Sequence, residues 1–124
     1  MKVNLFQICD GAYNYNGQLT IVGTFERIKA AQIPFRRNIG VAIKATREAD
    51  ELAATSLIVG LTDNAGVDIM PEINIPLSER DKNSDGKVIV AVTINNVLFK
   101  AKGVYKLTLF EGHQNLAEYE FDIV

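Results

Sequence analysis

The sequence is poor in the side chains that most often carry out chemistry. Its 124 residues include one cysteine, one histidine and no tryptophan, although 48% of them are hydrophobic. One cysteine excludes an internal disulfide and any zinc site that needs two or more thiolates. The 13 basic and 15 acidic side chains give a formal net charge of −2. The chain therefore lacks the positive charge that favours nucleic acids or anionic membranes, and we expect neither partner.

Long hydrophobic runs are scarce as well. No apolar stretch approaches the ~20 residues that a membrane helix needs. Asn4 and Gln7 interrupt the apolar start of the chain, which is unlike the uninterrupted centre of a signal peptide. These features predict a cytoplasmic protein. The length is typical of one domain, so we expect a single β-sandwich domain over residues 1–124.

What the sequence does contain is alternation of apolar and polar residues with a period of two. Turn residues interrupt this pattern about every ten residues, which is typical of short antiparallel strands. The stretch from Lys87 to Asn95 is apolar on both faces and is expected to be a central strand. Pro71 and Pro76 are expected to confine their stretch to a sheet edge or to split it. The predicted strands are 2–9, 18–28, 39–46, 55–62, 67–77, 87–95, 102–111 and 116–124.

This list of strands, with no convincing helix, predicts an all-β fold. We expect an immunoglobulin-like antiparallel β-sandwich of about seven to eight strands. Gly103 and Tyr105, at the start of the seventh stretch, resemble the tyrosine corner of such sandwiches, in which the tyrosine hydroxyl bonds to the backbone a few residues upstream. No cysteine follows Tyr105, so an antibody-type domain is not expected.

A tight hairpin is predicted at Asn16 and Gly17, because both residues tolerate the positive φ angles of a type I′ turn. This turn would place Asp10 on an apolar face, which is costly for an unpaired carboxylate. Gly11 and Gly23 flank this point, so we expect a bulge or bend that redirects Asp10. The expected cross-strand pairs are Tyr15 with Gln18, Tyr13 with Thr20, and Asp10 with Gly23.

The residues from Asp81 to Gly86 match the first half of a calcium loop. Oxygen ligands from Asp81, Asn83 and Asp85 could converge on a hard cation. Position twelve of such a loop would be Val92 instead of the bidentate glutamate that the loop requires. The alternative is a solvated loop, and Ca²⁺ is the one cofactor that the sequence leaves open.

The segment from Tyr13 to Gly17 is a second candidate site. Tyr13 and Tyr15 lie on one face of the predicted hairpin beside asparagine side chains. They could stack on a sugar ring or anchor a partner. The alternative is an ordinary β-ribbon surface, on which tyrosine is common.

No catalytic constellation is evident, and we expect no enzyme. His113 lies in a predicted turn and is expected at the surface, whereas Cys9 ends an apolar strand and is expected to be buried. A small hydrolase would need these two side chains within hydrogen-bond reach of each other.

Residues 8–12 and 17–28, with 33–35 following at the expected place, resemble a bacterial family of short uncharacterised β-domains, a domain of unknown function. The clear match covers about residues 8–35, and the agreement across the rest, including 103–105, is looser. The resemblance implies an immunoglobulin-like fold and no assigned activity. Within this fingerprint we expect Asp10 and Arg27 to pair across the end of the hairpin.

The sequence thus predicts a non-catalytic binding module with a protein partner. The alternative is a calcium-dependent binding module that uses residues 81–86. Strand edges are available recognition surfaces, and one of them could also join copies of the chain into a homo-oligomer.

Overall fold

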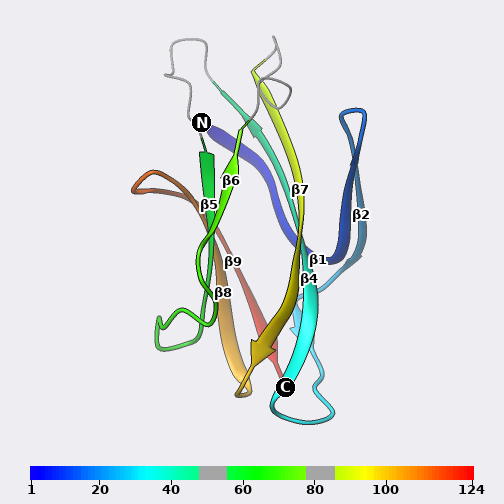
Figure 1. Ribbon diagram of the computed structural model, residues 1–124, viewed down its shortest axis with the longest axis vertical. Coiled ribbons are helices and arrows are strands. Elements are labelled where there is room, and N and C mark those ends of the chain that lie inside the picture. The colour runs from blue at the N-terminus through cyan, green and yellow to red at the C-terminus, as the bar shows by residue number, and fades with distance from the viewer. Residues whose placement is uncertain (48–55, 78–85) are drawn as a thin grey trace.

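The computed structural model describes residues 1–47, 56–77 and 86–124, and these form two β-sheets packed face to face (Figure 1). The predicted β-sandwich is confirmed, with nine strands in this part of the chain in place of seven or eight. The described residues include no helix that could cross a membrane. The strands are β1 (Lys2–Tyr15), β2 (Gln18–Thr24), β3 (Arg27–Ile28), β4 (Phe35–Thr46), β5 (Ser56–Thr62), β6 (Ile73–Pro76), β7 (Lys87–Phe99), β8 (Gly103–Glu111) and β9 (Gln114–Ile123).

The first sheet has the strand order β2-β1-β4-β7 and the second has β3-β9-β8-β5-β6. Every pairing is antiparallel except that of β3 with β9. The predicted strand 18–28 is therefore two strands in different sheets, because the chain crosses from the first sheet to the second between Thr24 and Arg27. Pro76 ends β6 at the edge of the second sheet, as its missing N–H group predicts.

The prediction of a central strand at residues 87–95 is wrong. β7 is an edge strand of the first sheet and continues beyond the predicted end at Asn95 as far as Phe99. Asn96 has a φ of 55°, and its N–H donates to the side-chain oxygen of Asn38 at 2.9 Å. The residues around Asn96 form a bulge opposite β4. The outer face of β7 is apolar because the β1–β2 hairpin partly covers it, and not because the strand is central.

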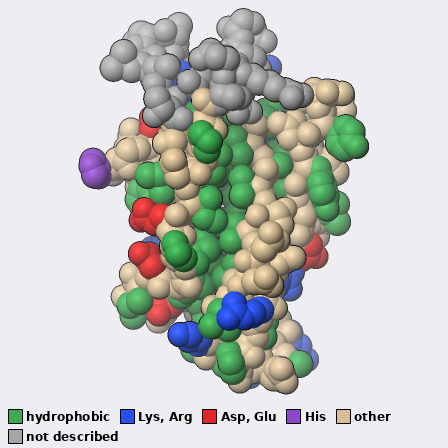
Figure 2. All heavy atoms as spheres, viewed as in Figure 1, with side chains coloured by type: hydrophobic (Ala, Val, Ile, Leu, Met, Phe, Trp, Pro, Cys, Tyr) green, Lys and Arg blue, Asp and Glu red, His purple; other side chains and the backbone are tan. Residues whose placement is uncertain are grey.

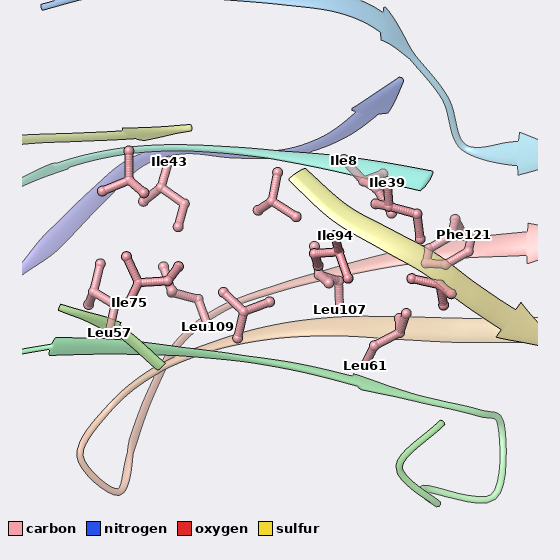
Figure 3. Packing of buried hydrophobic residues seen from close by; sticks show 14 of the residues in the cluster. Ile8, Ile39, Ile43, Leu57, Leu61, Ile75, Ile94, Leu107, Leu109 and Phe121 are labelled. Carbon is pink, nitrogen blue, oxygen red and sulfur yellow. The ribbon is translucent and has the colours of Figure 1, made fainter. Parts of the chain in front are cut away.

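The core lies between the two sheets, where alternate side chains of facing strands meet (Figure 3). Ile43 of the first sheet and Leu107 and Leu109 of the second are fully buried there. Burying each such side chain contributes roughly 1.5–3 kcal/mol. Phe121 lies edge-on to Phe99, with ring centroids 6.2 Å apart. Each strand thus alternates apolar and polar residues because every second side chain points into this core.

The tyrosine corner is confirmed. The Tyr105 hydroxyl donates a hydrogen bond of 2.6 Å to the carbonyl oxygen of Ala101, four residues upstream. Its ring is buried against Phe99 and Phe121. The connection between β7 and β8 is therefore tied to the core by one side chain.

Candidate functional site

The hairpin between β1 and β2 has the predicted turn and the predicted register. Asn16 and Gly17 have φ angles of 52° and 82°, as a type I′ turn requires. The side-chain oxygen of Asn14 accepts the N–H of Gly17 at 3.0 Å and braces this turn. The expected pairs are present as Tyr15 opposite Gln18 and Tyr13 opposite Thr20.

This hairpin folds back over the outer face of the first sheet. β1 pairs with β4 up to Cys9, and from Cys9 onward it pairs with β2 (Figure 1). Ala42 and Ala91, which face each other on β4 and β7, form the platform on which the hairpin lies. Their small side chains leave room for close approach. The contacting set is Cys9, Ala12 and Ala42, with Leu19, Ile21 and Ala91 packed around them.

Glycines make the fold-back sterically possible. A Cβ atom on Gly40 would lie 2.9 Å from the sulfur of Cys9 and 3.0 Å from the Cα of Gly11, so only glycine lets the bend of β1 cross β4 at this distance. Gly23 has a φ of 68°, which favours glycine, and it lies against Asp10. The predicted bend at Asp10 is confirmed.

The bend redirects the carboxylate of Asp10 to the surface, where it forms an ion pair with Arg37. The guanidinium of Arg37 also lies 4.7 Å from the ring centre of Phe25. The expected pairing of Asp10 with Arg27 is wrong, because Arg27 has crossed to the second sheet. There it contacts Asp122 at 3.2 Å, its neighbour in the parallel pairing of β3 with β9.

The outward face of the hairpin exposes apolar side chains. Six large hydrophobic side chains are exposed in the described residues, and three of them are Tyr13 (54%), Tyr15 (74%) and Val22 (53%). The strand register places these three on one face, which we call the hairpin face. The ring of Tyr13 lies over Gly11, and Gly11 is the residue that pairs with Val22 across the hairpin. The sequence prediction of a tyrosine surface omitted Val22, although the predicted register contained the information that places it there.

Asn14 lies on the opposite face of the hairpin, toward the sheet. Its amide nitrogen donates to the carbonyl of Ile89 at 3.3 Å, and its oxygen accepts the N–H of Gly17. Both ends of this amide therefore hold the hairpin in place. The structure does not place Asn14 beside the tyrosines, where the sugar hypothesis needed a polar side chain.

Cys9 and His113 are not brought together. Cys9 is fully buried under the hairpin, on the side of the first sheet that faces away from the second sheet. Its thiol donates to the Gly11 carbonyl at 3.2 Å, and burial raises the pKa of this thiol. His113 is exposed in the β8–β9 turn of the second sheet (Figure 2). The arrangement that a cysteine hydrolase needs is absent at this pair.

The calcium prediction lies outside the described residues, because Asp81, Asn83 and Asp85 all fall in the range 78–85. In residues 1–47, 56–77 and 86–124, no three His, Cys, Asp or Glu side chains gather as a metal site would require.

Two facing sheets and a tyrosine corner define the class as an immunoglobulin-like β-sandwich. The chain is similar in structure to an immunoglobulin-like protein from Pseudomonas aeruginosa, with a TM-score of 0.50, 15% sequence identity, and coverage of 99% of this chain and 95% of the other. A family model matches residues 4–124, and the chain belongs to that family, which is described as a family of unknown function (DUF6941). The comparison with curated proteins found no match. The predicted resemblance to an uncharacterised β-domain family is thereby confirmed.

Proposed function

We propose that this chain is a non-catalytic binding module that recognises a protein partner through the hairpin face. The observation that carries the proposal is the exposure of Tyr13, Tyr15 and Val22 on one side of a hairpin whose other side is packed on the sheet. Large apolar side chains that face solvent together are typical of interaction surfaces.

The chemistry of the hairpin face favours a protein over a sugar. Tyrosine combines a large apolar ring with a hydroxyl group and is enriched among the residues that dominate protein interfaces. Val22 adds an aliphatic surface. Apolar side chains of a protein partner can cover this surface, whereas it offers no hydrogen-bond partner to a sugar hydroxyl. Thr20 lies opposite Tyr13 and carries no charge, so the centre of the face can lose water at low cost.

The hairpin face is also held in place before any partner arrives. The Asn14 amide, the Gly40 crossing and the ion pair of Asp10 with Arg37 all fix the ribbon on the sheet. A surface that is already ordered loses little conformational entropy on binding, which favours affinity.

The test compares two double variants of the purified chain. Tyr13→Ala with Tyr15→Ala removes the aromatic rings, and Val67→Ala with Val104→Ala removes two exposed apolar side chains elsewhere. Proteins captured from the native host by the unmodified chain are purified, and their affinity for each form is measured by calorimetry. If each tyrosine is worth about 2 kcal/mol at the interface, the tyrosine variant binds about 1,000-fold more weakly.

The melting temperature of both variants should stay near that of the unmodified chain, because exposed side chains contribute little to stability. Equal binding by the tyrosine variant would contradict the proposal. So would a loss of binding confined to the valine variant. Glycan binding that depends on the tyrosines would instead support the sugar alternative.

A further inference from the structure

A groove lies at one end of the sandwich, between the β5–β6 connection and the start of β8. Its volume is about 550 Å³. Figure 2 shows Lys or Arg side chains beside apolar ones at the lower end of the molecule, near the end of β7. We call this groove the lysine groove. It is lined mainly by Val67, Ile69, Leu98, Lys100, Lys102 and Val104. It shares no residue with the hairpin face.

Both walls of the lysine groove are held by hydrogen bonds. On one side, the bond from Tyr105 to Ala101 fixes the β7–β8 connection. On the other, one carboxylate oxygen of Asp63 accepts the N–H groups of Ala65 and Val67, at 2.9 and 3.0 Å. The groove is therefore formed without a ligand, as most small-molecule sites are.

The side chains of the groove combine an apolar lining with cations at the rim. Val67 and Val104 are both exposed, and they are two of the six large hydrophobic side chains exposed in the described residues. Lys100 and Lys102 flank Ala101, and neither ammonium group has a hydrogen bond or ion pair with the described part of the chain. The turn thus presents two unpaired positive charges beside an apolar surface.

The facing wall carries the carboxylates of Asp63 and Asp68, which differ in their hydrogen bonds. The carboxylate of Asp63 accepts the backbone N–H groups of Ala65 and Val67. Asp68 is exposed, and its carboxylate has no hydrogen-bond or ion-pair partner among residues 1–47, 56–77 and 86–124. An anion in the groove would therefore be attracted to the turn of Lys100 and Lys102 and repelled from the wall of Asp63 and Asp68.

We propose that the lysine groove binds a small apolar carboxylate. The aliphatic or aromatic body of the ligand packs against Leu98, Val67 and Val104, and its carboxylate faces Lys100 and Lys102. A volume of about 550 Å³ suits a ligand of this class. This site goes beyond the proposed protein-binding surface and can be tested without it.

The first experiment is an NMR titration of the ¹⁵N-labelled chain with octanoate below its micellar concentration. Matched titrations use 1-octanol, which lacks the charge, and octylamine, which reverses it. We expect saturable shifts of amides in residues 63–69 and 98–105 with octanoate. We expect affinity for octanoate to be about tenfold above that for either analogue, as two exposed charge contacts allow.

Charge variants supply the second experiment. Lys100→Gln with Lys102→Gln should weaken octanoate binding about tenfold, and Asp68→Asn should strengthen it about two- to threefold. The matched control, Lys2→Gln with Lys44→Gln, removes two exposed lysines outside the groove and should leave affinity unchanged. All of these substitutions are at the surface, and their folding is checked by the same NMR spectra.

Three results would overturn the proposal. They are equal affinity for octanoate and 1-octanol, equal weakening by the control variant, and the absence of saturable shifts in the groove through the millimolar range. None of these results bears on the hairpin face, whose test depends on Tyr13, Tyr15 and a protein partner and uses the groove residues Val67 and Val104 only as its control.

Discussion

The hairpin face and the lysine groove expose the same kind of side chain in two different shapes. The hairpin face is one side of a two-stranded ribbon and combines two tyrosines with a valine. The groove places two valines between walls that carry charge. A ribbon face suits a broad protein surface, whereas a groove of about 550 Å³ suits a small molecule.

The two regions also differ in what holds them. The hairpin depends on a close approach of backbones at Gly40, while the groove depends on side-chain hydrogen bonds from Tyr105 and Asp63. Each surface therefore has its own support, so that each can be disrupted without the other.

The largest effect is expected from Gly40→Val. A Cβ there would lie 2.9 Å from the Cys9 sulfur, closer than Cβ atoms lie, and a tight 3.0 Å from the Gly11 Cα, so the hairpin must move off the sheet. We expect a loss of about 3 kcal/mol in the free energy of unfolding, measured by urea denaturation. Amide shifts should be concentrated in the hairpin and spare the groove.

Gly60→Ala is the control for this variant. A Cβ at Gly60 would meet its nearest atoms, in Phe110 and Glu72, at 3.8 and 3.9 Å, which is ordinary contact. Its stability should change by less than about 1 kcal/mol. Equal destabilisation by both variants would show that the backbone crossing at Gly40 has no special role.

A smaller effect is expected from Tyr105→Phe, which removes the hydrogen bond to Ala101 and keeps the ring in the core. We expect a loss of about 1 kcal/mol in stability and weaker octanoate binding, because the turn that carries the lysines loses its tether. Tyr15→Phe, in which the lost hydroxyl is exposed, should change neither quantity. An unchanged octanoate affinity in Tyr105→Phe would show that the corner does not hold the groove.

The pH dependence of stability should report the burial of Cys9 beneath the hairpin. Burial raises the pKa of this thiol, so the folded chain keeps its proton at pH values where the unfolded chain loses it. This contribution is complete below the unfolded pKa of about 8.5 and is lost as pH rises through the folded pKa. In urea denaturation between about pH 8 and 10, the unmodified chain should lose more stability than Cys9→Ala. If the stability of both forms fell equally over this pH range, the expectation of a raised Cys9 pKa in the folded chain would be wrong.

The smallest effects are expected from two arginines that each pair with an aspartate. Arg27 has a side chain that is 68% exposed, so Arg27→Gln should cost at most about 0.5 kcal/mol. Arg37 is 31% exposed and lies over Phe25, so Arg37→Gln should cost more, about 1 kcal/mol. Thermal unfolding of both variants measures the difference. A larger loss for Arg27→Gln would mean that the Arg37 contact does not brace the bend.

Much of the fold could be predicted because its signals are local. Alternation gave the strand positions, the pair Asn16 and Gly17 gave the hairpin turn, and the spacing of Gly103 and Tyr105 gave the corner. The bend at Asp10 followed from a physical conflict between a carboxylate and an apolar face.

The errors arose where distant parts of the chain decide the outcome. An apolar outer face on residues 87–95 suggested a central strand, but the cover comes from a hairpin more than 70 residues earlier. The partner of Asp10 depended on which sheet Arg27 joins, and no local pattern encodes that choice. The lysine groove was missed for the same reason, since its walls come from separate connections.

The parallel pairing of β3 with β9 has a consequence for the order of events during synthesis. The N–H of Asp122 donates to the Glu26 carbonyl at 3.0 Å, and that of Val124 donates to the Ile28 carbonyl at 2.9 Å. Residues 26–28 must therefore wait for residues 122–124 to leave the ribosome before they can pair. Such distant pairings slow folding and leave apolar strands open to aggregation in the meantime. A nascent chain of this protein should accordingly depend on chaperones until residues 122–124 have emerged.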